Sequence, residues 1–192
     1  MRPDVKARRD VWHEELKDVD PDRLVFLDES GARTDLARVR GRCPRGERLK
    51  SNLPHGHWKT YTMLGAIRTS GPCASALIDG PMDGDVFRAY VTLVLAPTLS
   101  PGDVVVMDNL QSHKASGVRE AIEAAGAELM YLPPYSPDYN PIENMWSKVK
   151  SLLRSAAART YESLQRAVWD ALDAVTTRDC CGFFRHCGYA AI

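Results

Sequence analysis

Two apolar runs of this chain each end in an aspartate, and runs of this kind are typical of strands buried on both faces. Leu-Val-Phe-Leu precedes Asp28, and Val-Val-Val-Met precedes Asp108. Strands that are apolar at every position occur in the parallel sheets of α/β proteins. Because side chains alternate along a strand, Asp28 shares a face with Phe26 and Asp108 shares a face with Val106. If the two strands are neighbours, both aspartates lie at one edge of the sheet, where α/β folds place their sites.

The order of the expected elements indicates a mixed sheet. Three expected strands come first, and alternating helices and strands follow, which predicts parallel pairing with right-handed crossovers in the second part. We therefore predict an α/β fold of the ribonuclease H-like (retroviral integrase-like) type, with a mixed five-stranded sheet flanked by helices and a C-terminal helical extension. Expected strands lie at 24–28, 59–69, 74–78, 104–108 and 128–132, with a further extended piece at 36–43. Expected helices lie within 1–23 and at 83–99, 115–125, 141–154, 161–175 and 178–192.

The domain boundaries follow from this order. We expect a helical linker at 1–23, a core at 24–155 and an extension of the same domain at 156–192. Hydrophobic residues make up 44% of the chain and charged residues 26%, an ordinary balance for a folded protein. No run approaches the roughly 18 apolar residues of a membrane span, and the first residues lack the apolar segment of a signal peptide. These features predict a cytosolic protein with no membrane partner. The five cysteines are an odd number, which favours free thiols.

A glutamate lies at the start of the helix expected at 141–154. Asn140, Pro141 and Glu143 fit the N-cap, first and third positions of a helix, so Glu143 could close a capping box. This role is compatible with a role at the strand edge, because the helix dipole keeps a glutamate at a helix start ionised and the rigid proline loop directs it toward that edge. Each aspartate alone is also compatible with a simple strand end, because aspartate is common in turns. Carboxylates gathered at one edge repel each other unless a cation lies between them, and their oxygens suit magnesium or manganese.

Basic residues are concentrated in one segment, although the net charge is zero. Residues 33–59 hold eight basic and two acidic side chains. Such a segment can neutralise phosphates or form a solvated surface, and a nearby carboxylate cluster favours phosphates. Trp58 could equally be a core residue, Asn109 and His113 could be structural hydrogen-bonding groups, and Lys148 could lie on a solvated face. The residues expected to contact DNA are Arg40, Arg42, Arg45, His57, Trp58, Lys59, Asn109, His113, Lys114 and Lys148.

Three motifs carry a family resemblance. They are Phe-Leu-Asp28-Glu-Ser-Gly, Val-Met-Asp108-Asn-Leu-Gln-Ser-His-Lys, and Leu-Pro-Pro-Tyr-Ser-Pro-Asp-Tyr-Asn-Pro-Ile-Glu143. Together they closely resemble the mariner-like insertion-sequence transposases of bacteria, which are members of the DDE superfamily. The 34 residues between Asp108 and Glu143 match that branch. Shorter matches are Arg40-Gly-Arg, Pro54-His-Gly-His-Trp-Lys-Thr and Asp79-Gly-Pro-Met-Asp-Gly.

This resemblance implies an endonuclease and polynucleotidyl transferase that performs cut-and-paste DNA transposition, with 24–155 as its catalytic domain. Asp28, Asp108 and Glu143 would be the catalytic residues and metal ligands, and Asp28 would bridge two Mg²⁺ (or Mn²⁺) ions. In-line phosphoryl transfer depends on positioning and charge neutralisation, so no covalent enzyme intermediate is implied. The implied partners are transposon ends, target DNA and a second copy of the chain. The implied location is the bacterial cytoplasm, in association with the nucleoid.

One feature departs from the family pattern. Members usually carry an N-terminal helix-turn-helix region that recognises the terminal repeats, whereas this chain resembles the catalytic half, so a separate helix-turn-helix half is an expected partner. Two alternatives remain. The chain could be a catalytically silent transposase remnant that acts as a DNA- or protein-binding module. It could also be a ribonuclease H-type hydrolase of RNA, which fits the proline-rich glutamate motif poorly.

Overall fold

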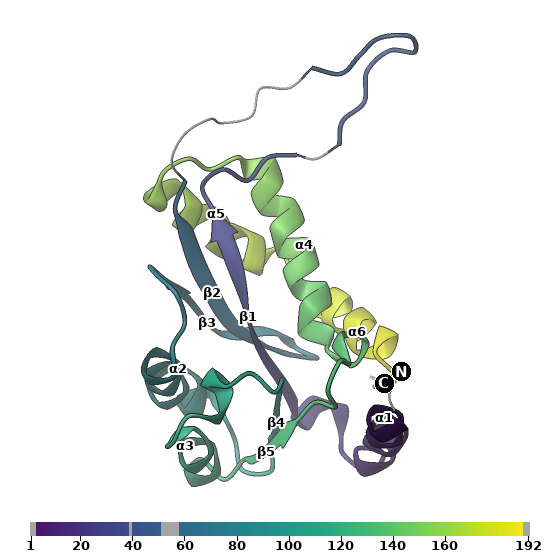
Figure 1. Ribbon diagram of the computed structural model, residues 1–192, viewed down its shortest axis with the longest axis vertical. Helices are drawn as coiled ribbons and strands as arrows, with labels where there is room; N and C mark the ends of the chain where they lie inside the picture. The colour runs from purple at the N-terminus through teal and green to yellow at the C-terminus, as the bar shows by residue number, and fades with distance from the viewer. Residues whose placement is uncertain (1–2, 39, 51–57, 190–192) are drawn as a thin grey trace.

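A mixed five-stranded sheet lies at the centre of the structure, a computed structural model that describes residues 3–38, 40–50 and 58–189 (Figure 1). The strand order is β3-β2-β1-β4-β5, with β1 antiparallel to β2 and parallel to β4. This arrangement confirms the predicted mixed sheet. The strands are β1 (Leu24–Arg33), β2 (Thr60–Arg68), β3 (Gly71–Ile78), β4 (Val104–Met107) and β5 (Glu128–Tyr131).

Helices cover both faces of the sheet. Helices α4, α5 and α6 pack on one face, and α2 and α3 pack on the other (Figure 1). Within the described part of the chain, no helix combines the length and apolar character needed to cross a membrane. The helices are α1 (Pro3–Glu15), α2 (Gly84–Tyr90), α3 (Val118–Ala124), α4 (Pro141–Ala156), α5 (Tyr161–Asp173) and α6 (Thr177–His186). Short helical turns lie at Pro21–Arg23, Val91–Leu95, Ala96–Thr98, Ser112–Lys114 and Pro137–Tyr139.

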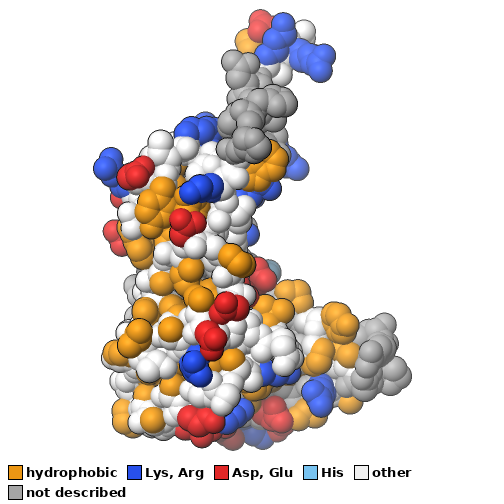
Figure 2. Space-filling model, turned by 60° about the vertical axis from the view of Figure 1, so that its left-hand side comes forward, with side chains coloured by type: hydrophobic (Ala, Val, Ile, Leu, Met, Phe, Trp, Pro, Cys, Tyr) orange, Lys and Arg blue, Asp and Glu red, His pale blue; other side chains and the backbone are white. Residues whose placement is uncertain are grey.

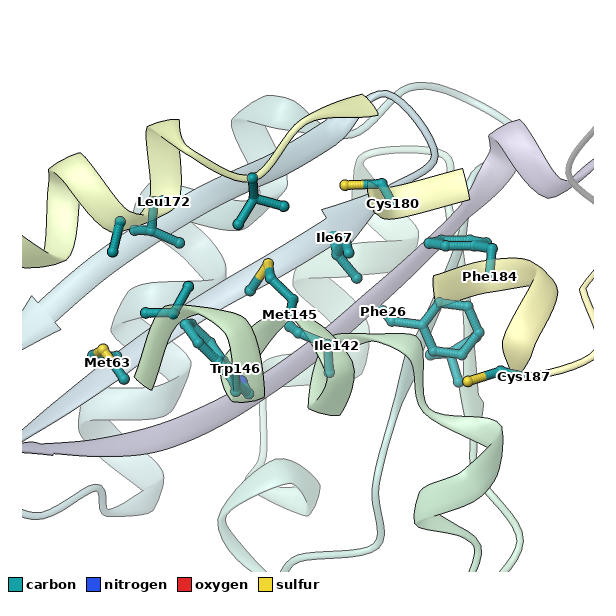
Figure 3. Packing of buried hydrophobic residues seen from close by; sticks show 14 of the residues in the cluster. Phe26, Met63, Ile67, Ile142, Met145, Trp146, Leu172, Cys180, Phe184 and Cys187 are labelled. Atoms are coloured by element: carbon teal, nitrogen blue, oxygen red, sulfur yellow. The ribbon is translucent and has the colours of Figure 1, made fainter. Parts of the chain in front are cut away.

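The alternation of side chains along β1 divides the core into two layers. Phe26 packs with α4 and α6, whereas Val25 and Leu27 pack with α2 and α3 on the opposite face. Figure 3 shows Trp146 and Met145 of α4 in the first layer. Trp146 is only 1% exposed, and its ring approaches β2 where Gly65 has no side chain; a Cβ built there would lie 3.3 Å from the ring. Helix α4 therefore rests directly on the sheet.

The extended piece predicted at 36–43 is wrong. Among its described residues, 36–38 and 40–43, the structure has no strand. Residues 40–50 are all exposed, and no strand of the sheet pairs with them. This segment projects from the body, and Lys and Arg side chains gather at its far end (Figure 2).

Two predicted helices are shorter than expected. The helix predicted at 83–99 begins at the N-cap Asp83 but loses α geometry after Tyr90 and continues as wider and then tighter turns. Pro97 lacks an amide hydrogen and cannot continue an α-helical ladder. The helix predicted at 115–125 begins only at Val118, because Gly117 has a φ of 89°, a left-handed conformation that no α-helix contains.

Helix α4 supplies a test of this packing. Trp146→Ala should lower the free energy of unfolding by about 3–5 kcal/mol, because it leaves a cavity under the helix. Trp169→Ala on α5 is the matched control, since its ring is 38% exposed, and it should cost much less. Urea denaturation followed by circular dichroism measures both. Equal losses for the two tryptophans would contradict a central role for Trp146.

Candidate active site

The register of the sheet brings Asp28 and Asp108 close together. Phe26 of β1 pairs with Val106 of β4 in parallel register, and each aspartate lies two residues further along its strand direction. Neighbouring strands lie about 4.8 Å apart. Asp28 does not end its strand as predicted, because β1 continues to Arg33 in its pairing with β2. Asp108 does follow directly after β4.

Glu143 enters the same region from the first turn of α4. The capping box that the sequence allowed is not formed, since Asn140 occupies the N-cap without a side-chain hydrogen bond to the helix. Asp28, Asp108, Asn140 and Glu143 all line one pocket of about 530 Å³. Its opposite wall is the proline-rich segment 132–137. The structure therefore gathers the three predicted carboxylates around one cavity.

Asp28 is held in an environment that opposes its charge. The side chain is 8% exposed, and its Oδ1 accepts one hydrogen bond of 2.8 Å from the backbone N–H of Glu29. Burial raises the pKa of Asp28, repulsion from Glu143 raises it further, and the single hydrogen bond offsets only part of this, so that the pKa is about 7. A bound proton or a bound cation would each relieve this strain.

Asp108 has the opposite environment, because a buried histidine stabilises its charge. His113 Nδ1 lies 2.7 Å from Asp108 Oδ1, poorly aligned for a hydrogen bond, and His113 Nε2 lies 2.7 Å from Glu29 Oε2. The ring also stacks on Phe87 at 4.3 Å. Burial alone would lower the pKa of His113, but the two carboxylates raise it to about 9. Desolvation likewise works against the charge of Asp108, yet His113 and the Leu110 N–H lower its pKa below the ordinary value.

The proline-rich wall of the pocket is fastened to α1. Arg9 donates to Asp138 Oδ1 at 2.9 Å and to Ser136 Oγ at 2.8 Å, and its guanidinium lies 4.3 Å from the centre of the Tyr139 ring. Trp12 Nε1 donates to the Tyr189 hydroxyl, which in turn donates to the Tyr139 carbonyl. These contacts hold the chain directly before Pro141 and thereby fix the start of α4.

The donor set of the pocket fits a hard divalent cation. The side-chain oxygen of Asn140 is buried without a hydrogen-bond partner, and it lines the cavity beside the three carboxylates. Asp28 and Asp108 each use only Oδ1 in the hydrogen bonds found among the described residues. In the conformations present, however, no three His, Cys, Asp or Glu groups of the described chain are gathered closely enough to hold an ion. The three carboxylates line the pocket, but their side chains are not close enough together to bind one ion in these conformations.

The structure places the predicted DNA-contacting residues in different regions. Asn109 lines the pocket and donates to the Leu132 carbonyl at 2.5 Å, so it also has a structural role. Lys114 is exposed and does not line the pocket, and its ammonium lies 5.4 Å from the centre of the Tyr131 ring. His113 is fully buried and takes the structural role described above. Lys148 binds Asp179 and the Ala174 carbonyl, which ties α4 to α6.

The remaining predicted contacts lie on or near the projecting segment. Trp58 is 53% exposed rather than part of the core, and the Arg33 guanidinium lies 4.8 Å from the centre of its ring. Lys59 is exposed, and His57 lies outside the described residues. Arg40, Arg42 and Arg45 are exposed and are not part of the pocket. Contact of these residues with DNA stays a prediction.

Sequence reasoning missed several residues around the pocket. Glu29 follows Asp28 directly, so strand alternation places it on the opposite face of the sheet. Its role depends on contact with the buried His113, which the sequence does not reveal. Asn140 was interpreted only as a helix cap. Arg9 gave no signal, because its partners lie about 129 residues away in the chain.

The chain also matches known proteins. Residues 23–165 match the family described as DDE superfamily endonuclease. The chain belongs to this family. The Tcb2 transposase of Caenorhabditis briggsae is 30% identical over 103 residues, which cover 50% of this chain and 37% of that protein. The chain thus spans well under half the length of this relative. The predicted DDE superfamily membership and endonuclease class are confirmed.

Solved structures of Mos1 transposase share the fold. A paired-end complex with the left transposon end superposes with a TM-score of 0.75 at 18% identity, covering 98% of this chain and 59% of that one. The Mos1 catalytic domain with raltegravir and Mn gives 0.73 at 15% identity, covering 95% and 86%. At these identities the likeness shows the fold alone, and it confirms the ribonuclease H-like prediction.

The pKa of Asp28 predicts how the stability of the metal-free protein depends on pH. The pKa is about 7 in the folded protein against an ordinary 3.8, so the folded state is favoured while Asp28 is protonated and loses this advantage as pH rises from 4 to 7. Asp28→Asn carries no such penalty. It should therefore exceed the wild type in stability by up to about 4 kcal/mol above pH 7, and the gain should vanish near pH 4.

Urea denaturation in EDTA between pH 4 and pH 8 measures this difference. Asp85→Asn, at an exposed position on α2, is the matched control and should show no pH-dependent gain. A gain for Asp28→Asn that stays constant across the pH range would contradict the electrostatic origin.

Proposed function

We propose that this chain is the catalytic domain of a DNA transposase, with Asp28, Asp108 and Glu143 as its catalytic residues and metal ligands. The observation that carries the proposal is the gathering of these carboxylates around one pocket, where burial of Asp28 and then repulsion from Glu143 raise the pKa of Asp28 to about 7. A folded protein maintains such repulsion at a cost in stability, and functional sites are where such costs concentrate. Membership of the DDE superfamily endonucleases supports the same assignment.

The reaction would be metal-dependent cleavage of DNA strands followed by strand transfer. Two Mg²⁺ or Mn²⁺ ions supply activation of a water or 3′-hydroxyl nucleophile and neutralise charge on the phosphate. Asp28, Asp108 and Glu143 line the pocket and would hold the ions, and the family resemblance makes Asp28 the candidate shared ligand. His113 lowers the pKa of Asp108, and the first turn of α4 carries Glu143 to the same pocket. Mos1 catalytic domain structures are described with Mn and with Mg, which supports divalent ions.

The proposed substrates are transposon ends and target DNA. Mos1 complexes are described as a paired-end complex with a transposon end and as a strand transfer complex. By analogy, we propose a homodimer on paired ends, with a helix-turn-helix half supplying recognition of the terminal repeats. The motifs of the sequence further support a bacterial insertion sequence as the source, and hence action on DNA in the bacterial cytoplasm at the nucleoid. The exposed arginines of 40–50 are candidates for backbone contacts.

Cleavage of a supercoiled plasmid tests the function. The plasmid carries the inverted repeats that flank the gene, and the purified chain is added with Mn²⁺. Asp108→Ala should reduce nicking at least 100-fold, because one proposed ligand and its stabilised charge are lost. Asp85→Ala, an exposed carboxylate on α2, should nick as the wild type does.

The outcomes separate the alternatives. Equal nicking by Asp108→Ala would refute the assigned site. Binding of the plasmid without any Mn²⁺-dependent cleavage would favour the silent remnant. Hydrolysis of an RNA strand in an RNA–DNA duplex, with no cleavage of the plasmid, would favour the ribonuclease.

A further inference from the structure

The lip of the candidate active site carries an exposed aromatic ring that the proposed chemistry does not use. Tyr135 lines the pocket and is 82% exposed, more than any other large apolar side chain among the described residues. The ring does not contribute to the packing of the core, because most of its surface is exposed to solvent. Its position beside the carboxylates therefore calls for an external contact.

Tyr135 also has an unfavourable backbone conformation. Its φ is 57°, in the left-handed region that favours glycine, and among the described non-glycine residues only Ala74 and Ala157 share a positive φ. Such a conformation costs a bulky residue free energy that packing contacts normally repay. Tyr135 has few such contacts. The sequence thus places a large ring where glycine would be less strained.

The backbone that carries the ring is held rigidly. Pro133 and Pro134 precede Tyr135, and Pro137 follows it, so rotation about φ is restricted on both sides. Arg9 donates to the Tyr135 carbonyl at 3.4 Å and to Ser136 Oγ at 2.8 Å. A ring on a fixed backbone loses little entropy when it binds a partner.

We propose that Tyr135 is a stacking platform for the nucleobase next to the scissile phosphate, a role that rests on the proposed DNA function. The carboxylates of the pocket engage the phosphate only through cations, and Arg9 already binds Asp138, so the neutral ring is what the loop presents to DNA. A base at a cleaved strand end has one open face, and stacking on tyrosine covers it. Stacking of this kind tolerates any sequence, because every base has a π-face.

A double-mutant cycle tests the contact. Fluorescence anisotropy with Ca²⁺ measures the binding of a labelled duplex that ends at the cleaved 3′-hydroxyl, with the terminal nucleotide either intact or abasic. Loss of the base should weaken binding to the wild type at least fivefold, and Tyr135→Phe should behave alike because it keeps the ring. Tyr135→Ala should bind the two duplexes equally, at the weaker level.

Two controls restrict the interpretation. An abasic nucleotide placed ten base pairs from the end should show no coupling to Tyr135. Trp169→Ala, which removes a partly exposed ring from α5 outside this pocket, should leave the wild-type difference intact. Additive losses, in which Tyr135→Ala remains as sensitive to the terminal base as the wild type, would overturn the proposal.

The strain at Tyr135 gives a second measurement. Tyr135→Gly should melt at a higher temperature than Tyr135→Ala, since glycine adopts positive φ freely, while both lose the coupling to the terminal base. A lower melting temperature for the glycine variant would overturn the claim that the ring is held against backbone preference. Plasmid nicking that depends on Asp108 but occurs without any coupling to Tyr135 refutes the platform and leaves the catalytic function intact. Coupling between Tyr135 and the terminal base without any plasmid nicking supports the platform and refutes the catalytic function.

Discussion

The burial of Asp28 beside Glu143 is the constraint on which the candidate site depends. Each carboxylate is carried by an element that core packing holds in place, so neither side chain can move far from the other. The residues before Asp28 are completely enclosed by both core layers, and α4 is pressed onto β2 through Trp146 at Gly65. The hydrophobic core thus holds Asp28 away from water and near Glu143, and both the burial and the repulsion raise the pKa of Asp28. A protein that kept this arrangement for stability alone would be more stable with an amide at position 28.

The adjacent pair Asp28 and Glu29 shows how one strand serves both sides of the sheet. Alternation directs Asp28 toward α4 and the pocket, and Glu29 toward the face covered by α2. There Glu29 meets His113, whose other nitrogen lies against Asp108. His113 therefore stabilises the anionic form of Asp108, whereas Asp28 has no such neighbour among the described residues. The two aspartates acquire opposite pKa shifts because Asp28 is the more deeply buried and because only Asp108 has a cationic neighbour.

The parts of this structure that the sequence predicted are those set by local pattern. Apolar runs located β1 and β4, and the phase of Phe26 and Val106 placed both aspartates on one face. The error at 36–43 arose because a glycine-punctuated sequence is compatible with both strands and projecting loops, and pairing with a neighbouring strand, which local sequence does not reveal, decides between them. Distant pairings such as Arg9 with Asp138 leave no periodic signal. The conformation of Tyr135 is likewise set by tertiary contacts and not by its own preference.

The proline-rich segment and the start of α4 connect Tyr135 to Glu143 through a short, restricted stretch of chain. It carries Tyr135 at one end and leads through Asn140 into Pro141 and Glu143 at the other, and Arg9 fastens its middle to α1. The spacing between the aromatic ring and the glutamate is thus restricted by a short chain in which Pro137 and Pro141 have fixed φ angles. One stretch of chain consequently sets the position of Tyr135, which would stack on the base, and of Glu143, which would hold the cation at its phosphate. Loosening Arg9 would disturb both together, whereas changing Asp108, which is held separately by His113, would disturb only the charge.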